Sequence, residues 1–238
     1  MSTVIPIILV LLTTLGIFQL RTWTGKLKFV LLKDSRLDGL LKFQSAQLIL
    51  TIVVLVIIYL LNPANFATFF RFGDVNARIG KISWLGITGN ETWLQIALTL
   101  GLFITLGTGI FMFLQVKKAD MANLRVLKEL GGFIGWALLF SAMNAFSEEA
   151  IFRMGIVSPL YGQLSVPIIA IISGVLFGLP HYFGQPSGPV GVLMAGFLGW
   201  LLALSLIETQ GLFLAWAIHF VQDVVIFVSM FAMSQKSD

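Results

Sequence analysis

The fold is decided by one stretch, residues 131–157, which reads GGFIGWALLFSAMNAFSEEAIFRMGIV. The carboxylates of Glu148 and Glu149 and the guanidinium of Arg153 interrupt a run that is otherwise apolar and long enough to cross a bilayer. Ionisable groups inside a membrane span are costly, and by default they mark a working site. The stretch therefore predicts a membrane-spanning helix that carries functional side chains.

Helical spacing gives these charged residues different roles. Glu149 precedes Arg153 by four residues, which is the favourable order for an ion pair on one helix face. Glu148 points about 100° away from Glu149 around the helix, which leaves it free for chemistry. Asn144 lies one turn before Glu148 and can hydrogen-bond its carboxylate. The alternative is a purely structural cluster of buried salt bridges that only fixes helix packing.

The composition indicates an integral membrane protein. The 238 residues are 58% hydrophobic and only 11% charged, whereas soluble domains are about a quarter charged. Apolar runs close to the length of a span occur at residues 3–20, 44–61, 94–116, 131–157, 164–183, 188–206 and 212–233. We therefore predict an all-α, polytopic transmembrane helix bundle with about seven to eight spans.

The whole chain, residues 1–238, is expected to form a single membrane domain, because it is too short to add a soluble domain of ordinary size. A motif-bearing core at 131–233 follows N-terminal spans and loops at 1–130. The first apolar run lacks a basic n-region and a cleavage site, so we interpret it as a retained span. The chain has no cysteine, which excludes disulfides, thiolate metal ligands and cysteine nucleophiles.

Basic residues in the loops set the expected orientation. Residues 21–42 carry six Lys and Arg against two Asp, so the positive-inside rule makes this loop cytoplasmic and leaves the N-terminus outside. The segment 26–33, KLKFVLLK, is typical of a basic amphipathic stretch on the inner membrane surface, and equally of a solvated basic loop. A second basic loop agrees with this orientation through Lys117, Lys118, Arg125 and Lys128.

Both histidines of the chain lie in predicted spans or at their ends. Pro180 removes a helical hydrogen bond, so a kink is expected immediately before His181. His219 and Asp223 are four residues apart and share a helix face. Each histidine could be a structural residue that is satisfied inside the bundle. Together with Glu148 as general base, they could instead activate a water molecule for hydrolysis.

A metal is the alternative use of the same atoms. Glu148, His181 and His219 could hold a divalent ion such as zinc, because two histidines and a carboxylate are a common ligand set. The chain contains no HExxH motif, which excludes the usual helical zinc-protease arrangement. No cofactor is predicted, and the sequence leaves a metal open.

Three motifs occur in order along the chain: Glu148-Glu149-x-x-x-Arg153, Phe177-x-x-x-His181 and His219-x-x-x-Asp223. This set resembles the motifs of the CPBP family, also called the Abi or CAAX-protease-like family. Its members are membrane-embedded endopeptidases related to the enzyme that removes the last three residues of prenylated CAAX proteins. The resemblance covers residues 146–223, whereas residues 1–130 match only in being hydrophobic.

The resemblance implies that Glu148 acts as the base on a water together with His181, while His219 and Asp223 contact the oxyanion. The supporting residues expected from the motifs and from helical spacing are Asn144, Glu149, Arg153 and Phe177. The implied partners are the lipid bilayer and a peptide or protein substrate, with or without a lipid modification. The charge pattern gives no reason to expect nucleic acid.

Two features do not fit this scheme directly. Family members often carry Asn where this chain has Asp223, and an ionised aspartate cannot donate to an oxyanion. We expect Asp223 to orient His219 as an acceptor, the alternatives being a protonated Asp223 or no oxyanion role. In addition, ideal antiparallel helices would separate Glu148 and His181 by roughly 10 Å along the bundle, which tilt or the Pro180 kink must close.

Other functions are compatible with the same residues. One is a non-catalytic membrane binding or bacteriocin-immunity-type protein, and another is a proton-coupled transporter, since intramembrane Glu, His and Asp also form proton relays. The absence of an internal repeat in the sequence argues against a transporter. The expected location is the plasma membrane of a prokaryote, because the chain is small and has no organellar targeting segment.

Overall fold

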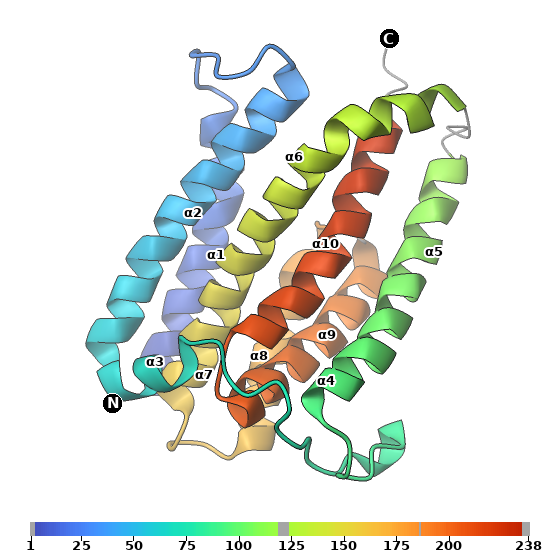
Figure 1. The fold of residues 1–238 in the computed structure, drawn as a ribbon. Helices are drawn as coiled ribbons and strands as arrows, with labels where there is room; N and C mark the ends of the chain where they lie inside the picture. Colours follow the sequence, from blue (N-terminus) through green and yellow to red (C-terminus); the bar gives the residue numbers. More distant parts are fainter. Residues whose placement is uncertain (1–2, 119–123, 186, 235–238) are drawn as a thin grey trace.

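The computed structural model describes residues 3–118, 124–185 and 187–234, without side chains at 115–118, 124–130 and 233–234. All the extended regular structure in these ranges is helical (Figure 1). The predicted all-α membrane bundle is therefore confirmed. The second predicted basic loop, with Lys117, Lys118, Arg125 and Lys128, lies outside the described side chains.

The elements follow the chain from α1 to α10 with four tighter or wider turns between them. They are α1 (Val4–Thr24), α2 (Ser35–Leu61), α3 (Pro63–Phe69), the 3-10 turn η1 (Ser83–Leu85), α4 (Trp93–Ile96), the π-turn η2 (Ala97–Gly101), α5 (Leu102–Lys118), α6 (Leu124–Glu148), the π-turn η3 (Glu149–Met154), α7 (Gly155–Leu160), α8 (Val166–Gly178), the 3-10 turn η4 (Leu179–Tyr182), α9 (Gly188–Thr209) and α10 (Phe213–Ser234).

Each of the seven predicted apolar runs is helical. Within the described residues, five helical segments are long and apolar enough to cross a membrane: Val4–Thr24, Ser35–Leu61, Trp93–Leu114, Gly188–Thr209 and Phe213–Ala232. The run at 164–183 forms a shorter apolar helix, Val166–Tyr182. The run at 131–157 is formed by α6, η3 and α7, which succeed one another without a break.

Helix α2 begins earlier than predicted, so the expected loop at 21–42 is wrong in its second half. The helix starts at Ser35 because the carboxylate of Asp34 caps it, accepting from the backbone N–H groups of Arg36 at 2.9 Å and Leu37 at 3.3 Å. One turn further on, Asp38 and Lys42 form an ion pair at 2.7 Å. The remaining connection between α1 and α2 is residues 25–34 (Figure 1).

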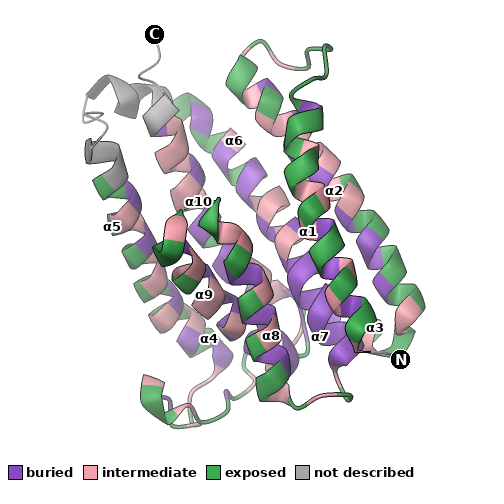
Figure 2. Ribbon diagram, turned by 180° about the vertical axis from the view of Figure 1, so that it is seen from behind, coloured by how far each residue is buried: buried purple, intermediate pink, exposed green. Residues whose placement is uncertain are grey.

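The bundle places α1 and α2 on one side and α5 on the other, with α6 and α10 between them (Figure 1). Buried residues gather on α7 and on the inward faces of the other helices, whereas α1, α2 and α5 expose their outer faces (Figure 2). Those outer faces are apolar, as at Leu12 and Phe103. This is the pattern of a bundle that faces lipid.

Helices α8 and α9 approach each other closely because glycines line their contact. A Cβ atom added at Gly174 would lie 2.8 Å from the carbonyl oxygen of Gly196, and one at Gly178 would lie 2.7 Å from that of Val192. Small residues let the backbones of two membrane helices meet in this way. The packing fixes the end of α8 that carries the second motif.

The turn between α7 and α8 brings the first and second motifs to similar heights. Helix α7 ends at Leu160 and α8 begins at Val166. With these helix bounds, ideal helical rise gives Glu148 and His181 an offset of roughly 5 Å along the bundle, in place of the roughly 10 Å expected from the sequence. Near Pro180, where a kink was expected, the α-helix gives way to the 3-10 turn η4 at Leu179.

Residues 70–92 lie at the end of the bundle opposite the α1–α2 connection (Figure 1). They pack on the turn between α9 and α10. The backbone N–H of Leu212 donates to the carbonyl of Arg71 at 2.9 Å, and that of Asp74 donates to Thr209 at 2.8 Å. The indole of Trp93 donates to Glu208 at 2.9 Å. Helix α2 ends at Leu61, which is also where the predicted apolar run 44–61 ends.

Candidate functional site

The predicted ion pair of the first motif is present in the π-turn η3. The Nε atom of Arg153 lies 3.0 Å from Oε2 of Glu149, and both side chains are fully buried. The guanidinium carbon of Arg153 also lies 4.1 Å from the ring centroid of Phe177 on α8. The pair therefore joins the first motif to the second through a cation–π contact.

His219 is oriented by Glu149 and not by Asp223. Its Nδ1 atom lies 2.8 Å from Oε1 of Glu149, and an ionised carboxylate only accepts, so Nδ1 is the donor. The expectation that Asp223 holds the imidazole is thereby corrected, since its Oδ1 lies 3.7 Å from Nε2 on the other side of the ring. Oε2 of Glu148 lies 3.6 Å from the same Nε2.

Asn144 is the polar centre of the site. Its Nδ2 donates to Oε1 of Glu148 at 3.1 Å, as predicted, and to Oδ2 of Asp223 at 3.0 Å. Because carboxylates accept, these two contacts fix the orientation of the amide and turn Oδ1 towards α2. There Oδ1 accepts from Nε2 of Gln44 at 3.3 Å and of Gln47 at 3.4 Å. Asn144 uses both its donors and accepts twice.

Gln44 and Gln47 are site residues that the sequence reasoning missed. They lie on α2, about a hundred residues before Asn144, and both are almost completely buried. Helical spacing predicts contacts within a helix and gives no partner on another one. The available signal was a pair of amides three residues apart at the start of an apolar run, since polar groups inside a span need partners.

His181 presents one free ring nitrogen. Its Nδ1 lies 2.8 Å from the backbone oxygen of Phe177, which can only accept, so Nδ1 donates and Nε2 of the neutral ring has no proton. Nε2 has no hydrogen-bond partner in the described part of the chain. The ring of Phe177 lies between the two histidines, with centroids 4.7 Å from His181 and 5.5 Å from His219.

These side chains surround one cavity of about 750 Å³. The predicted site residues in its wall are Asn144, Glu148, Phe177, His181, His219 and Asp223. Glu149 and Arg153 lie behind the wall and do not line the cavity, whereas the side chain of Glu148 is 20% exposed. The cavity continues along α1 and α2 as far as Arg21 and Arg36. Glu148 thus lines the cavity, whereas Glu149 is buried in its ion pair with Arg153.

The alternative metal site does not fit the described side chains. Among the residues that the structure describes, no group of three or more His, Asp and Glu side chains is arranged to hold a metal ion. The set Glu148, His181 and His219 is therefore not supported as a ligand set.

Fold and site together define a helical membrane protein whose ionisable groups gather around an internal cavity. Comparison with protein families gives the more particular assignment. Residues 130–225 match the family described as type II CAAX prenyl endopeptidase Rce1-like. The matched segment contains all three motifs, and the resemblance to the CPBP, or CAAX protease, family that they indicate is confirmed.

No curated protein and no solved structure matches the chain. The family assignment supports a CAAX-type intramembrane protease, a hydrolase that acts on peptide or protein substrates within a membrane. The roles of single residues do not follow from the match.

Proposed function

We propose that the protein is a membrane-embedded endopeptidase in which Glu148 and His181 activate a water molecule. One observation carries the proposal: Glu148 and His181 line the same cavity as His219 and Asp223, while Glu149 and Arg153 are buried behind it. The free carboxylate and the free imidazole nitrogen therefore face a common space, and the second carboxylate is held in an ion pair.

In the proposed reaction, the carboxylate of Glu148 takes a proton from the water, and the water oxygen attacks the carbonyl carbon of the peptide bond. Nε2 of His181 accepts a hydrogen bond from the same water. When the tetrahedral intermediate collapses, the C–N bond breaks and Glu148 passes its proton to the leaving nitrogen. The products are a carboxylic acid and an amine, so the water supplies all the added atoms.

The intermediate carries a negative oxygen that needs a donor. His219 can fill this role in its protonated form, because Glu149 accepts from Nδ1 and leaves Nε2–H directed at the cavity side. Asp223 accepts from Asn144 and faces Nε2 of His219 at 3.7 Å. We assign Asp223 to holding the amide of Asn144 and not to donating to the oxyanion.

The proposed setting is a multi-pass protein in the plasma membrane of a prokaryote. Its substrate is a peptide or protein segment, with or without a lipid modification, that is cleaved near a C-terminus or close to the membrane. The apolar helices support a membrane location, and the cavity of about 750 Å³ offers space for part of a peptide segment.

The test is cleavage of a quenched fluorescent peptide library by the purified protein in detergent. Wild type is compared with Glu148→Ala and His181→Ala, with and without a chelator, and with Glu91→Ala as a control in the exposed loop at the far end. Loss of a general base costs about 10²- to 10⁴-fold in rate. We expect both site variants to lose activity on this scale, the control to keep it, and the chelator to have no effect.

Each other outcome points to a named alternative. Activity that disappears on chelation and returns with metal would assign Glu148, His181 and His219 to metal ligation. A binding or immunity protein would give two results: well-folded purified samples would cleave nothing, and Glu148→Ala would keep the biological effect in cells. Solute flux in proteoliposomes that depends on Glu148 would identify a transporter.

A further inference from the structure

The loop between α1 and α2, residues 25–34, is not used by the proposed reaction, yet it displays an apolar surface. The exposed fractions are 44% for Leu27, 53% for Phe29, 74% for Val30 and 54% for Leu31. Single exposed apolar residues are ordinary, but four within five positions of one loop form a contiguous patch. The patch lies outside the helices, so the lipid-facing surface of the bundle does not account for it.

The ion pair of Asp38 and Lys42 on α2 anchors the loop. Oδ1 of Asp38 accepts from the backbone N–H groups of Leu31 at 2.6 Å and Leu32 at 3.0 Å. Nζ of Lys42 donates to the carbonyl of Leu27 at 3.3 Å and lies 4.8 Å from the ring centroid of Phe29. The backbone is therefore anchored while the apolar side chains point outward.

The charge around the loop is strongly positive once internal pairs are set aside. Asp34 pairs with Arg36 at 2.9 Å and Asp38 pairs with Lys42 at 2.7 Å. These are the two acidic residues of the segment 21–42. Its other cations have no carboxylate partner among the described residues, and all of them are exposed: Arg21, Lys26, Lys28 and Lys33.

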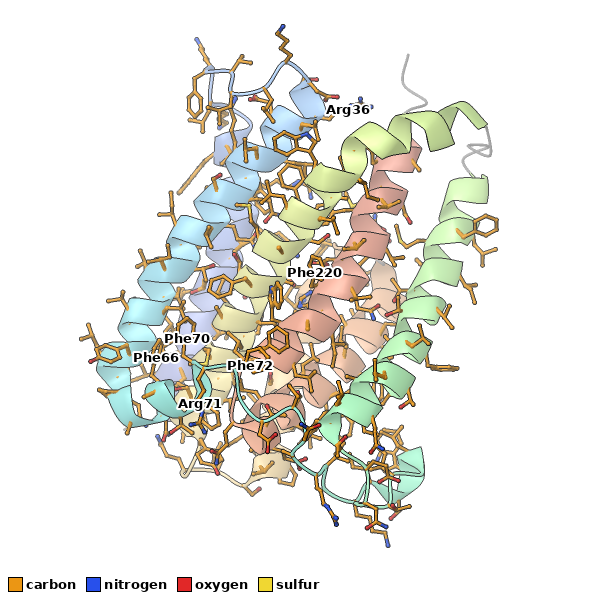
Figure 3. All side chains as sticks on the ribbon, in the orientation of Figure 1. Arg36, Phe66, Phe70, Arg71, Phe72 and Phe220 are labelled. Atoms are coloured by element: carbon orange, nitrogen blue, oxygen red, sulfur yellow. The ribbon has the colours of Figure 1, made fainter. Side chains whose placement is uncertain are left out.

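The position of the loop matches the level of the lipid headgroups. Arg36 lies at the end of the bundle where the loop connects α1 to α2, and Arg71 lies at the opposite end (Figure 3). Helices that cross a bilayer end in its headgroup region. Lysines interleaved with apolar side chains at that level suit the surface of an anionic leaflet.

We propose that residues 25–34 form a binding surface for anionic phospholipid at the rim of the cavity. The apolar side chains enter the boundary between headgroups and acyl chains, and the lysines contact lipid phosphates. The rim location follows from Thr24, Gly25, Ser35 and Arg36, which flank the loop or begin it and also line the cavity. Lipid bound there would border the route by which a membrane-held substrate enters.

The first experiment measures lipid preference of the full chain in nanodiscs of phosphatidylcholine with a minor fraction of phosphatidylglycerol. Retained lipids are counted by native mass spectrometry. A lysine near an anionic surface is worth about fivefold in binding, so we expect Lys26→Gln/Lys28→Gln, which removes two of them, to lower the preference for phosphatidylglycerol by roughly 25-fold. The matched control is Arg78→Gln/Lys81→Gln, which removes two exposed cations at the other end and should leave the preference unchanged.

The second experiment locates the loop. Because the chain has no cysteine, Val30→Cys carries a single fluorescent label, and we expect lipids brominated near the headgroup to quench it only in the anionic nanodiscs. Inorganic phosphate is added as a competitor: displacement by phosphate alone would reveal an anion site without lipid specificity. A label that stays in water, with equal lipid preference in both charge variants, would overturn the proposal in favour of a solvated loop. Neither readout requires cleavage, so the result is independent of the proposed function.

Discussion

At the residue scale, Glu149 is a completely buried carboxylate whose two oxygens both face partners. One of its oxygens faces Arg153 at 3.0 Å and the other faces His219 at 2.8 Å. Both partners come from other turns or helices, and the carboxylate is completely buried. A buried charge of this kind is stable only with its partners in place.

Removing one partner should therefore destabilise the protein. We expect Arg153→Met to lower the free energy of unfolding by about 3–5 kcal/mol, because the buried carboxylate of Glu149 loses its counter-charge. The measurement is denaturant or thermal unfolding in detergent. In the double variant Glu149→Gln/Arg153→Met no charge is stranded, and most of the stability should return. A single variant as stable as wild type would contradict this account of the pair.

The contacts foreseen at this scale were those within one helix. Spacing along the chain predicted Glu149 beside Arg153 and Asn144 beside Glu148, and both are present. The contact between Glu149 and His219 was not foreseen, because it joins residues 70 positions apart on different helices. Helical periodicity carries no information on which faces of two helices meet, so it cannot choose between Glu149 and Asp223 as the partner of the imidazole.

At the element scale, α2 contributes to a site whose motifs all lie after residue 130. Gln44 and Gln47 reach Asn144 from α2, and Asn144 in turn holds Glu148 and Asp223. The helix lies outside the segment 130–225 that matches the family. The family motifs alone are therefore an incomplete description of the polar network.

This network predicts a loss of turnover in α2 variants. A hydrogen bond between neutral groups contributes about 0.5–1.5 kcal/mol, so Gln44→Met/Gln47→Met should lower kcat for peptide cleavage roughly tenfold by loosening Glu148, with KM little changed. Each single variant should lose less, because the other amide remains. Thr51→Val serves as the control, since it removes a buried hydroxyl of α2 that bonds only to the backbone of Gln47. A change in KM as large as the change in kcat, together with an equal fall of kcat in Thr51→Val, would instead indicate general damage to the helix.

Element boundaries were predicted well where an apolar run ends and poorly where charges belong to a helix. The stop after Leu61 was correct. The start of α2 was placed nine residues late, because Arg36, Asp38 and Lys42 suggested a loop. In the structure their charges are paired at a helix end that extends beyond the apolar run, which hydropathy alone does not detect.

At the scale of the whole molecule, the two described connecting segments with free cations lie at opposite ends of the bundle (Figure 1). The connection 25–34 lies at one end and the segment 70–92 at the other. The positive-inside rule assigns the first to the cytoplasm. Hydropathy was sufficient to predict the helices, but the cavity depends on how eight or more segments pack, and no pattern within one segment encodes it.

The orientation can be tested because the chain has no cysteine of its own. We expect Lys81→Cys to react with a membrane-impermeant maleimide on intact cells, and Lys28→Cys to react only after the membrane is permeabilised. Wild type gives the background, and protein in detergent should label at both positions. The reverse pattern would show that the bundle is inverted and that the connection 25–34 lies outside the cell.

The π-turn at Glu149–Met154 constrains the number of residues that this part of the chain can have. A single π-turn is equivalent to one residue inserted into an α-helix, and its removal would rotate everything beyond it by about 100°. A one-residue deletion here would turn the buried face of α7, from Gly155 to Leu160, away from its present neighbours. The number of residues between Glu148 and Tyr161 is thus under constraint in its own right, and length polymorphism should be tolerated in the loops but not in this interval.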